Sequence, residues 1–322
     1  MKKLASLLLI FVLVMTALTG CGGQEAPAET TSEGTTEEAK VIRLGVCIPN
    51  FDDTFLVYMM DGMKAYASTL GDNVEVTYVD AKEDAALQLS QVENFVIQDV
   101  DAIVIVPANT ESVDPINAAA EAAGIPLIYV NRYPSTLPES AVFVGSQSID
   151  AGVFQMEYVA EALGGEGNVV IMMGMLGHEA QVMRTQGNKD VAEKHPGIKI
   201  IKEQTANWQR AEGMNLMENW LSSGDKIDAV LANNDEMALG AIQALEAQGL
   251  LEDVIVTGVD ATPDALTVME EGKLSATVFQ DAAGQGGGGI DAAYKIAMGE
   301  NVDREVWIPF QLVTPENLSD FK

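Results

Sequence analysis

VIRLGVCIPNFDDTFLVYMMDGMKAYASTL, residues 41–70, contains the structural unit that the rest of the chain repeats. Residues 41–48 form a short apolar run rich in β-branched side chains, which is typical of a buried strand. Residues 55–70 then place apolar side chains three and four positions apart, as on the buried face of an amphipathic helix. That face consists of Leu56, Met59, Met60, Met63, Ala67 and Leu70. The stretch therefore predicts a strand, a polar loop and a helix.

The same alternation continues along the chain. Further apolar runs that favour strands occur at 74–79, 102–106, 125–130, 169–173, 198–201, 229–232, 254–259 and 276–279. Helical patterns separate these runs, and a repeated strand–helix–strand order builds parallel sheets that helices cover on both faces. Roughly 280 residues follow position 40, which is enough for two domains of ordinary size. The sequence thus predicts an α/β fold with two doubly wound parallel-sheet lobes.

Residues 1–20 have the pattern of a signal peptide. Lys2 and Lys3 precede the apolar stretch 4–18, which has the length of a secretory signal and is too short to be favoured as a membrane span. It ends in LTGC, residues 18–21, which resembles the bacterial lipobox, so Cys21 would be diacylated and become the N-terminus after cleavage. The alternative is an uncleaved signal anchor. We expect an exported protein that is lipid-anchored through Cys21 to the outer face of the cytoplasmic membrane, or a periplasmic one.

The segment after the lipobox is a predicted tether. Residues 22–40 contain no large apolar side chain and many Gly, Glu, Thr and Ala residues. Such a segment cannot bury enough apolar surface to fold. We therefore expect residues 21–40 to comprise the lipidated cysteine and a disordered acidic tether, which holds the folded part away from the membrane.

The chain is strongly acidic, with 48 Asp and Glu residues against 18 Lys and Arg residues and a formal net charge of -30. Loss of residues 1–20 removes Lys2, Lys3 and no acid, so 16 minus 48 gives -32 for the mature chain. This balance excludes nucleic acid as a partner and general attraction to anionic lipid, because both depend on Lys and Arg. Besides Cys21 the only cysteine is Cys47, within an apolar run, so no disulfide is expected and the thiol should be buried and unreactive.

Ligands of doubly wound sheets bind beyond the carboxyl ends of the strands, and the unusual polar and aromatic residues of this chain lie there. They are Asp52, Asp53, Thr54, Phe55, Asn131, Arg132, Tyr133, Pro134, Gly177, His178, Arg184, Ala206, Asn207, Trp208, Asn233, Asn234, Asp235, Asp260, Ala261, Gln280 and Asp281. Each alone has an ordinary structural explanation. Asp53 and Asp235 could cap helices, Trp208 and Phe55 could pack in cores, and His178 could be purely structural. Their recurrence at most strand ends favours a ligand site.

Four of these loops resemble the sugar-binding proteins of bacterial ABC importers, in particular the ribose-binding and galactose/glucose-binding types. The stretches that carry the resemblance are FDDTF at 51–55, VNRYPS at 130–135, ANNDEMALG at 232–240 and GVDATP at 258–263. The similarity runs over nearly all of residues 41–320. It implies the type I periplasmic-binding-protein fold, with two lobes joined by a three-segment hinge. It also implies a monosaccharide ligand, ABC importer permease subunits as partners, a monomer, no cofactor and no enzymatic activity.

The resemblance implies a set of ligand-binding residues as well. The family's first-loop acid and stacking aromatic correspond to Asp53 and Phe55, and its fourth-strand pair corresponds to Asn131 and Arg132. In the second lobe the corresponding residues are His178, Arg184, Trp208, Asn234, Asp260 and the hinge amide Gln280. These residue types suit a sugar, because aromatic rings stack on its C–H faces while carboxylates, amides and guanidinium groups bind its hydroxyls.

The ligand fingerprint is mixed. Arg132 and Gln280 match the ribose type, whereas Asn131 and Trp208 match the galactose/glucose type, and Ala180 stands where the latter has an Asp. A neutral ring with hydroxyls around its whole edge satisfies both patterns. We therefore expect an aldohexose such as galactose or glucose, or ribose, with a cyclitol such as myo-inositol next.

Two stretches could be mistaken for cofactor sites. GQGGGG at 284–289 matches the dinucleotide motif GxGxxG, but the chain ends too soon for a dinucleotide-binding domain, so close helix packing explains it better. Residues 164–168, where the galactose/glucose type has a calcium loop, offer one carboxylate, so no metal is expected. The sequence also has no motif of an NTPase, zinc protease, serine hydrolase or thiol redox enzyme.

Three functions remain open on the sequence alone. A transport receptor is favoured, and it could also serve a chemosensor or sensor kinase. An exported glycosidase would use two carboxylates, such as Asp53 and Asp260, as acid and nucleophile. A ligand-sensing transcription regulator shares the two-lobed core, but it would need a DNA-binding module where this chain has a lipobox and an acidic tether.

The resemblance also predicts the layout of the lobes. The family's topology implies that the chain crosses between lobes near 145–146, 280–281 and 309–311. The N-terminal lobe would then comprise 41–146 and 281–309, and the C-terminal lobe 147–280 and 310–322.

Overall fold

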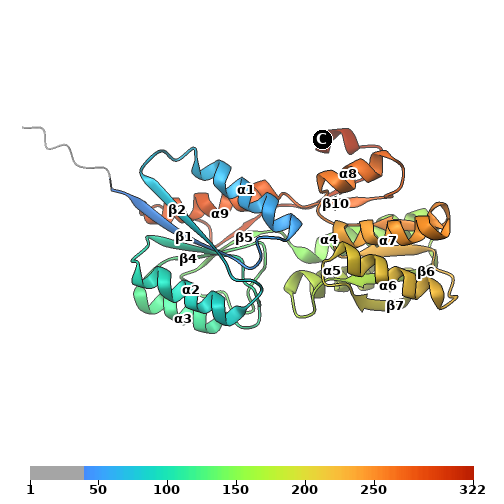
Figure 1. Cartoon of the computed structure of the whole chain (residues 1–322), viewed down its shortest axis with the longest axis horizontal. Helices are drawn as coiled ribbons and strands as arrows, with labels where there is room; N and C mark the ends of the chain where they lie inside the picture. Colours follow the sequence, from blue (N-terminus) through green and yellow to red (C-terminus); the bar gives the residue numbers. More distant parts are fainter. Residues whose placement is uncertain (1–39) are drawn as a thin grey trace, which may run out of the picture. The chain divides into compact units, whose positions relative to one another are not determined.

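A computed structural model describes residues 40–322 (Figure 1). The predicted signal peptide, the lipidation of Cys21 and the tether up to residue 39 lie outside the described residues. Within 40–322, every helix is too short or too polar to span a membrane.

The first half is built on a six-stranded sheet whose neighbouring strands are all parallel, in the order β11-β5-β4-β3-β1-β2. The strands are β1 (Ile42–Ile48), β2 (Val74–Asp80), β3 (Ala102–Ile105), β4 (Leu127–Val130), β5 (Val142–Gly145) and β11 (Glu305–Trp307). Helices α1 (Thr54–Ala67) and α9 (Ala282–Ala297) pack together on one face, and α2 (Ala85–Ile97) and α3 (Asp114–Ala123) cover the other (Figure 1). Side chains of β1 alternate between these layers, with Leu44 and Val46 in the α1 core and Cys47 in the α2 core.

The second half repeats the plan on a four-stranded parallel sheet in the order β7-β6-β8-β9. Its strands are β6 (Glu166–Met173), β7 (Gly197–Thr205), β8 (Ala229–Ala232) and β9 (Ile255–Thr257). Helix α4 (Ser148–Ala162) packs on α5 (Glu179–Ala192), α6 (Arg210–Ser222) packs on α7 (Asp235–Gln248), and each pair has its own core against the sheet. In both halves the second strand lies at the edge and the first beside it, which confirms the predicted doubly wound fold.

Three short connections join the halves. The chain leaves the first sheet after β5 and enters α4, and it returns from β10 (Thr277–Phe279) to α9. It then passes from β11 to β12 (Gln311–Val313), which pairs antiparallel with β10. Two isolated parallel bridges, Thr257 to Ala276 and Asp260 to Phe279, tie the β10 segment to the edge of the second sheet, where α8 (Pro263–Glu270) also lies. The predicted three-segment hinge is therefore present.

Most predicted elements exist, with shifted ends. Each of the nine predicted strands is found, whereas β5, β11 and β12 were not predicted. Asp53 does cap α1, since its Oδ1 accepts a hydrogen bond from the Leu56 backbone N–H at 3.0 Å. The capping alternative for Asp235 is wrong, because Asn234 caps α7 by accepting from the Met237 N–H, and Asp235 is the first helical residue. Cys47 is fully buried, as predicted, and burial raises the pKa of its thiol to about 12.

The glycine-rich stretch 284–289 lies inside α9 and forms no loop before a helix. Asp281 caps this helix by accepting a hydrogen bond from the Gly284 N–H at 2.7 Å. A Cβ on Gly286 would overlap the carbonyl oxygen of Met59 in α1, and one on Gly289 would overlap the side chain of Val130 in β4. The glycines thus serve close packing, as predicted, and the dinucleotide motif has no loop with which to hold a phosphate.

Candidate functional site

A cavity lies where the strand-end loops of the two halves meet. Its lining residues are Asp53, Phe55, Leu56, Asn131, Arg132, His178, Ala180, Arg184, Trp208, Asn234, Asp260 and Gln280. The structure therefore brings together all ten residues that the sequence analysis assigned to ligand binding. Leu56 and Ala180 are added to the wall.

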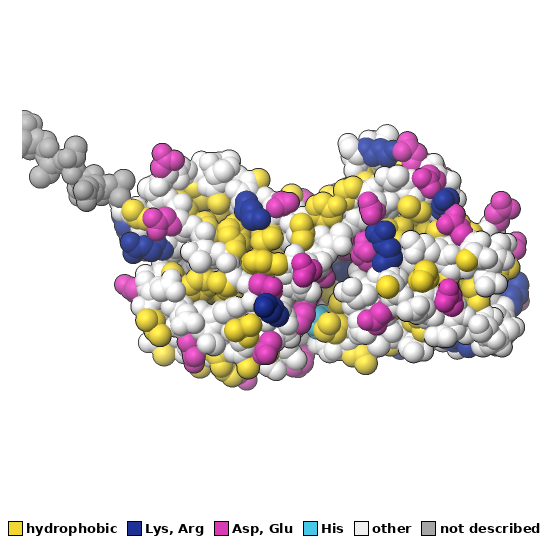
Figure 2. Space-filling view, viewed as in Figure 1, with side chains coloured by type: hydrophobic (Ala, Val, Ile, Leu, Met, Phe, Trp, Pro, Cys, Tyr) yellow, Lys and Arg dark blue, Asp and Glu magenta, His cyan; other side chains and the backbone are white. Residues whose placement is uncertain are grey.

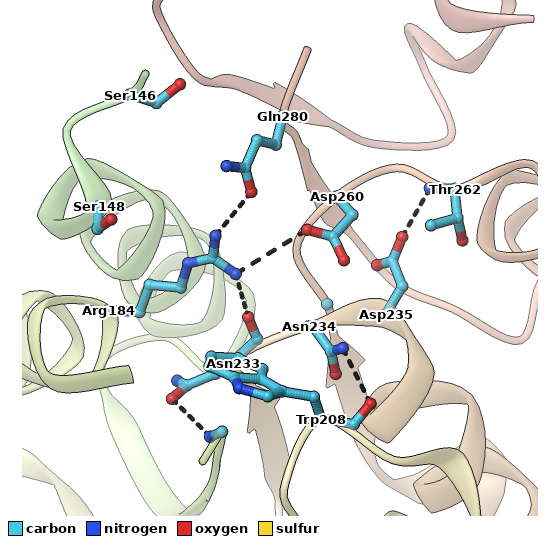
Figure 3. Close-up of polar contacts among 12 residues, drawn as sticks. Ser146, Ser148, Arg184, Trp208, Asn233, Asn234, Asp235, Asp260, Thr262 and Gln280 are labelled. Atoms are coloured by element: carbon cyan, nitrogen blue, oxygen red, sulfur yellow. Dashed lines mark hydrogen bonds and ion pairs between the residues drawn. The ribbon is translucent and has the colours of Figure 1, made fainter. Parts of the chain in front are cut away.

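Arg184 lies at the centre of the polar contacts in the second half (Figure 3). It projects from α5, and its guanidinium donates to the backbone oxygen of Asn233 at 2.6 Å and to Gln280 Oε1 at 2.7 Å. It also lies 3.9 Å from the carboxylate of Asp260. Its Nε–H is buried and has no protein acceptor among residues 40–322, so it remains available to a ligand oxygen.

Asp260 is the acid nearest to this arginine. Its side chain is almost fully buried, and burial raises the carboxyl pKa well above the ordinary value, while Arg184 opposes that shift. A ligand hydroxyl that donates to this carboxylate would replace part of the solvation lost on burial.

The acid and arginine of the first half have protein partners as well. Asp53 both caps α1 and lines the cavity, so the capping role does not exclude a role in ligand binding. The guanidinium of Arg132 donates to the Pro107 carbonyl oxygen at 3.0 Å and forms an ion pair with Glu83 at 3.4 Å. Sequence reasoning missed Glu83, which lies in the loop before α2 and compensates the charge of a buried arginine.

Trp208 and His178 form a connected aromatic wall. The indole Nε1–H donates to His178 Nδ1 at 3.2 Å, and the two ring centres are 6.2 Å apart. Burial, with a contribution from nearby Arg132, lowers the pKa of His178 to about 3, so the ring is neutral and can accept this bond. The Arg184 guanidinium lies 5.9 Å from the centre of the Trp208 ring, within cation–π range.

Non-glycine residues with positive φ are concentrated in the strand-end loops around the cavity. Of the eight non-glycine residues with positive φ among residues 40–322, five belong to them: Asn131, Asn207, Trp208, Asp260 and Ala261. Left-handed conformations of such residues cost of order 1–3 kcal/mol each and persist where the surrounding structure imposes them, often at functional sites. This signal is independent of residue type and could not be read from the sequence.

Asn234 and Asp235 hold the second-half loops together (Figure 3). The Asn234 side chain donates to the Trp208 carbonyl oxygen at 3.2 Å while it caps α7. The carboxylate of Asp235, fully buried, accepts from the Thr262 N–H at 2.8 Å and from the Thr277 hydroxyl at 2.6 Å. Asp235 thereby joins the loops that carry Asn234 and Asp260 to the strand that leads to the hinge.

Asp235 should make the stability of the protein depend on pH. Burial raises its pKa from 3.8 to about 7, so the folded state binds more protons than the unfolded state between these values. The contribution is therefore stabilising at low pH and is lost as pH rises from about 4 to about 7. We expect Asp235→Asn to abolish this decline, which amounts to about 2 to 3 kcal/mol between pH 5 and 7.5. Urea unfolding of both proteins at pH 5 and 7.5 measures it, and identical pH slopes would contradict it.

Trp208→Ala should weaken ligand binding by about 1 to 3 kcal/mol, or roughly ten- to hundredfold, while the protein stays folded. The indole is half-buried and contributes a face of the cavity, so its removal costs stacking area. Trp307→Ala is the control, because Trp307 lies on β11, is 37% exposed and does not line the cavity. Calorimetric titration of both variants tests the expectation, which fails if Trp208→Ala binds as tightly as Trp307→Ala.

Among residues 40–322 no group of three His, Cys, Asp or Glu side chains is placed to hold an ion.

Asp and Glu side chains are spread over the visible face of the molecule and do not form one patch (Figure 2). This distribution is that of a solvated acidic surface.

Comparisons with known proteins agree with the resemblance to the sugar-binding proteins of bacterial ABC importers. Residues 44–301 match the model of the periplasmic binding protein domain. The chain is 48% identical to a putative rhizopine-binding protein of Rhizobium meliloti, over 87% of this chain and 92% of the relative. It is 30% identical to the ribose import binding protein of Bacillus subtilis, over 98% and 99%. A crystal structure of an ABC transporter solute-binding protein from Bacillus halodurans with bound myo-inositol is 51% identical, with a TM-score of 0.85 and coverage of 89% and 99%.

Proposed function

Because this chain belongs to the periplasmic binding protein family, whose domain spans its residues 44–301, we propose that it captures a cyclitol for an ABC importer, with myo-inositol as the ligand. The observation that carries the proposal is the 51% identity to a solute-binding protein with bound myo-inositol, over 89% of this chain. The sequence analysis ranks an aldohexose or ribose before a cyclitol, whereas this similarity supports placing the cyclitol first.

The chemistry of the cavity suits a cyclitol. Such a ring carries a hydroxyl on every carbon and has neither a ring oxygen nor an exocyclic arm, so partners are needed in every direction around it. Acids, amides and arginines line the cavity from both halves, with Asp53 and Asn131 on one side and Asp260 and Gln280 on the other. Phe55 and Trp208 supply aromatic faces for the C–H surface of the ring.

We further propose that the ligand holds the two lobes together. The proposed lobes comprise 41–146 with 281–309 and 147–280 with 310–322, and the division of the strands between separate sheets supports these bounds. A ligand that contacts both lobes stabilises the closed arrangement in proportion to its extra contacts there. The exported monomer would be tethered through a lipid on Cys21 and would present the closed form to the permease subunits of an importer.

A glycosidase is disfavoured by the contacts of its two candidate carboxylates. Asp53 caps a helix and Asp260 lies beside Arg184, and both belong to the set that the family resemblance assigns to ligand hydroxyls. Incubation with an inositol glycoside or a nitrophenyl glycoside tests this alternative directly. Release of free sugar or nitrophenol would establish an enzyme.

A thermal-shift panel tests the ligand class. It comprises myo-inositol, galactose, glucose, ribose, amino acids and short peptides. At a concentration one hundred times its Kd, the true ligand stabilises the folded state by about 2.7 kcal/mol, or roughly 5 to 10 °C for a protein of this size. We expect the largest shift from myo-inositol. A shift from galactose or ribose without one from myo-inositol would overturn the cyclitol proposal, and a response to amino acids alone would overturn the polyol class.

A further inference from the structure

We propose that Gln285 is a positioning residue that fixes the side-chain amide of Asn131 in the ligand site. This inference rests on the proposed function, because it assumes that Asn131 contacts the polyol. The close packing of α9 explains the glycines of the stretch 284–289, and the proposed role explains Gln285, the one residue of the stretch that is not glycine.

Gln285 holds the side chain of Asn131 through a buried hydrogen bond. Gln285 is fully buried, and its Oε1 accepts a hydrogen bond from Asn131 Nδ2 at 2.9 Å. Its own Nε2 donates to the hydroxyl of Ser146 at 2.9 Å. In this arrangement the oxygen of Gln285 faces Asn131, and Asn131 offers it the amino group. The Oδ1 of Asn131 is then left as the acceptor for a ligand hydroxyl in the cavity that Asn131 lines.

The glycines explain how Gln285 reaches Asn131. Helix α9 lies against the end of β4 because Gly289 has no side chain to meet Val130, the residue that precedes Asn131. Gly286 likewise lets the helix approach α1. Asn131 itself has a left-handed φ of 67°, and its backbone N–H donates to the Val144 carbonyl oxygen at 2.9 Å. The backbone is thus held by the sheet, and the side chain is held by Gln285.

The position of Gln285 also links the site to the hinge. Ser146 lies between β5 and α4, where the chain first leaves the N-terminal half. Gln285 follows the second connection, between β10 and α9, by less than two turns of helix. One buried amide therefore joins two of the three hinge segments to a residue of the cavity wall.

A double-mutant cycle between Gln285 and Asn131 tests the proposal. The variants are Gln285→Met, Asn131→Ala and the double variant, titrated calorimetrically with myo-inositol or, if it does not bind the wild type, with the polyol of the panel that binds most tightly. We expect Gln285→Met to weaken binding about tenfold or more in the wild type and less than threefold in the Asn131→Ala background. Equal losses in both backgrounds would overturn the role, because a general structural effect does not depend on Asn131.

Two further variants separate positioning from folding. Asn117→Leu removes another buried amide of the N-terminal half, which donates to the Thr136 carbonyl oxygen and accepts from the Tyr129 hydroxyl. It should destabilise the protein and leave affinity within threefold. Gln285→Glu keeps an acceptor for Asn131, so this variant should bind the polyol at least threefold more tightly than Gln285→Met does. If Gln285→Met does not fold, the affinity of Gln285→Glu should lie within about tenfold of the wild-type affinity. An affinity of Gln285→Glu below the limit that applies would overturn the proposal. Failure of every polyol in the panel would instead reject the proposed function.

Discussion

Arg184→Met is expected to weaken polyol binding at least a hundredfold and to lower the free energy of unfolding of the ligand-free protein by about 3 to 5 kcal/mol. Methionine fills a similar length with apolar atoms and cannot donate a hydrogen bond. The variant therefore removes the guanidinium without leaving a large cavity. Calorimetric titration and urea unfolding measure the two effects.

The large expected losses of affinity and stability follow from the contacts of the Arg184 side chain. The side chain is 5% exposed and donates to Asn233 and Gln280, which belong to the β8 loop and the hinge. Without the guanidinium, Asp260 remains buried without its neighbouring positive charge, and its pKa, already raised by burial, would rise further. A ligand would then meet an acid that ionises less readily and an unsupported hinge amide in place of an acid paired with a guanidinium.

Arg210→Met is the matched control. Arg210 also forms hydrogen bonds to two acceptors, at 2.6 Å to Glu236 and at 3.0 Å to Asp264, but it lies on α6 outside the cavity and is only partly buried. Its ion pairs are screened by solvent, so a loss near 1 kcal/mol and unchanged affinity are expected. Comparable losses of affinity in the two variants would show that Arg184 acts through overall stability and has no specific role in the site.

The repeat of strands and helices was predictable because both halves bury their strands on two faces, which leaves long apolar runs in the sequence. Two of the three missed strands lack that signal, since β11 and β12 have three residues each and are partly exposed. They form at the edge of the first sheet and at the hinge, where pairing partners distant in sequence decide the structure. The third, β5, does carry the signal, because its four residues VFVG are all buried, and the sequence analysis overlooked it.

The lining of the cavity was predictable through loop motifs, but its internal contacts were not. The sequence could not show that Asn234 and not its neighbour Asp235 caps α7, since both residue types favour that position. Nor could it pair Gln285 with Asn131 or Glu83 with Arg132, because no periodicity relates residues that meet only in the folded chain. What the sequence supplied was the set of groups at the strand ends, and the fold supplied their partners.

Adjacent glycines of α9 should respond in opposite directions to alanine. Gly286→Ala is expected to lower the free energy of unfolding by about 2 to 3 kcal/mol, because the added Cβ would overlap the Met59 carbonyl oxygen and push α9 away from α1. Gly287→Ala should be neutral or stabilise the protein by up to about 1 kcal/mol, since its nearest neighbour, Tyr66 Cβ, is 3.4 Å away and alanine favours the helix. Urea unfolding of both variants measures the difference. Equal effects would mean that helix propensity, and not the contact between α1 and α9, explains the glycine-rich stretch.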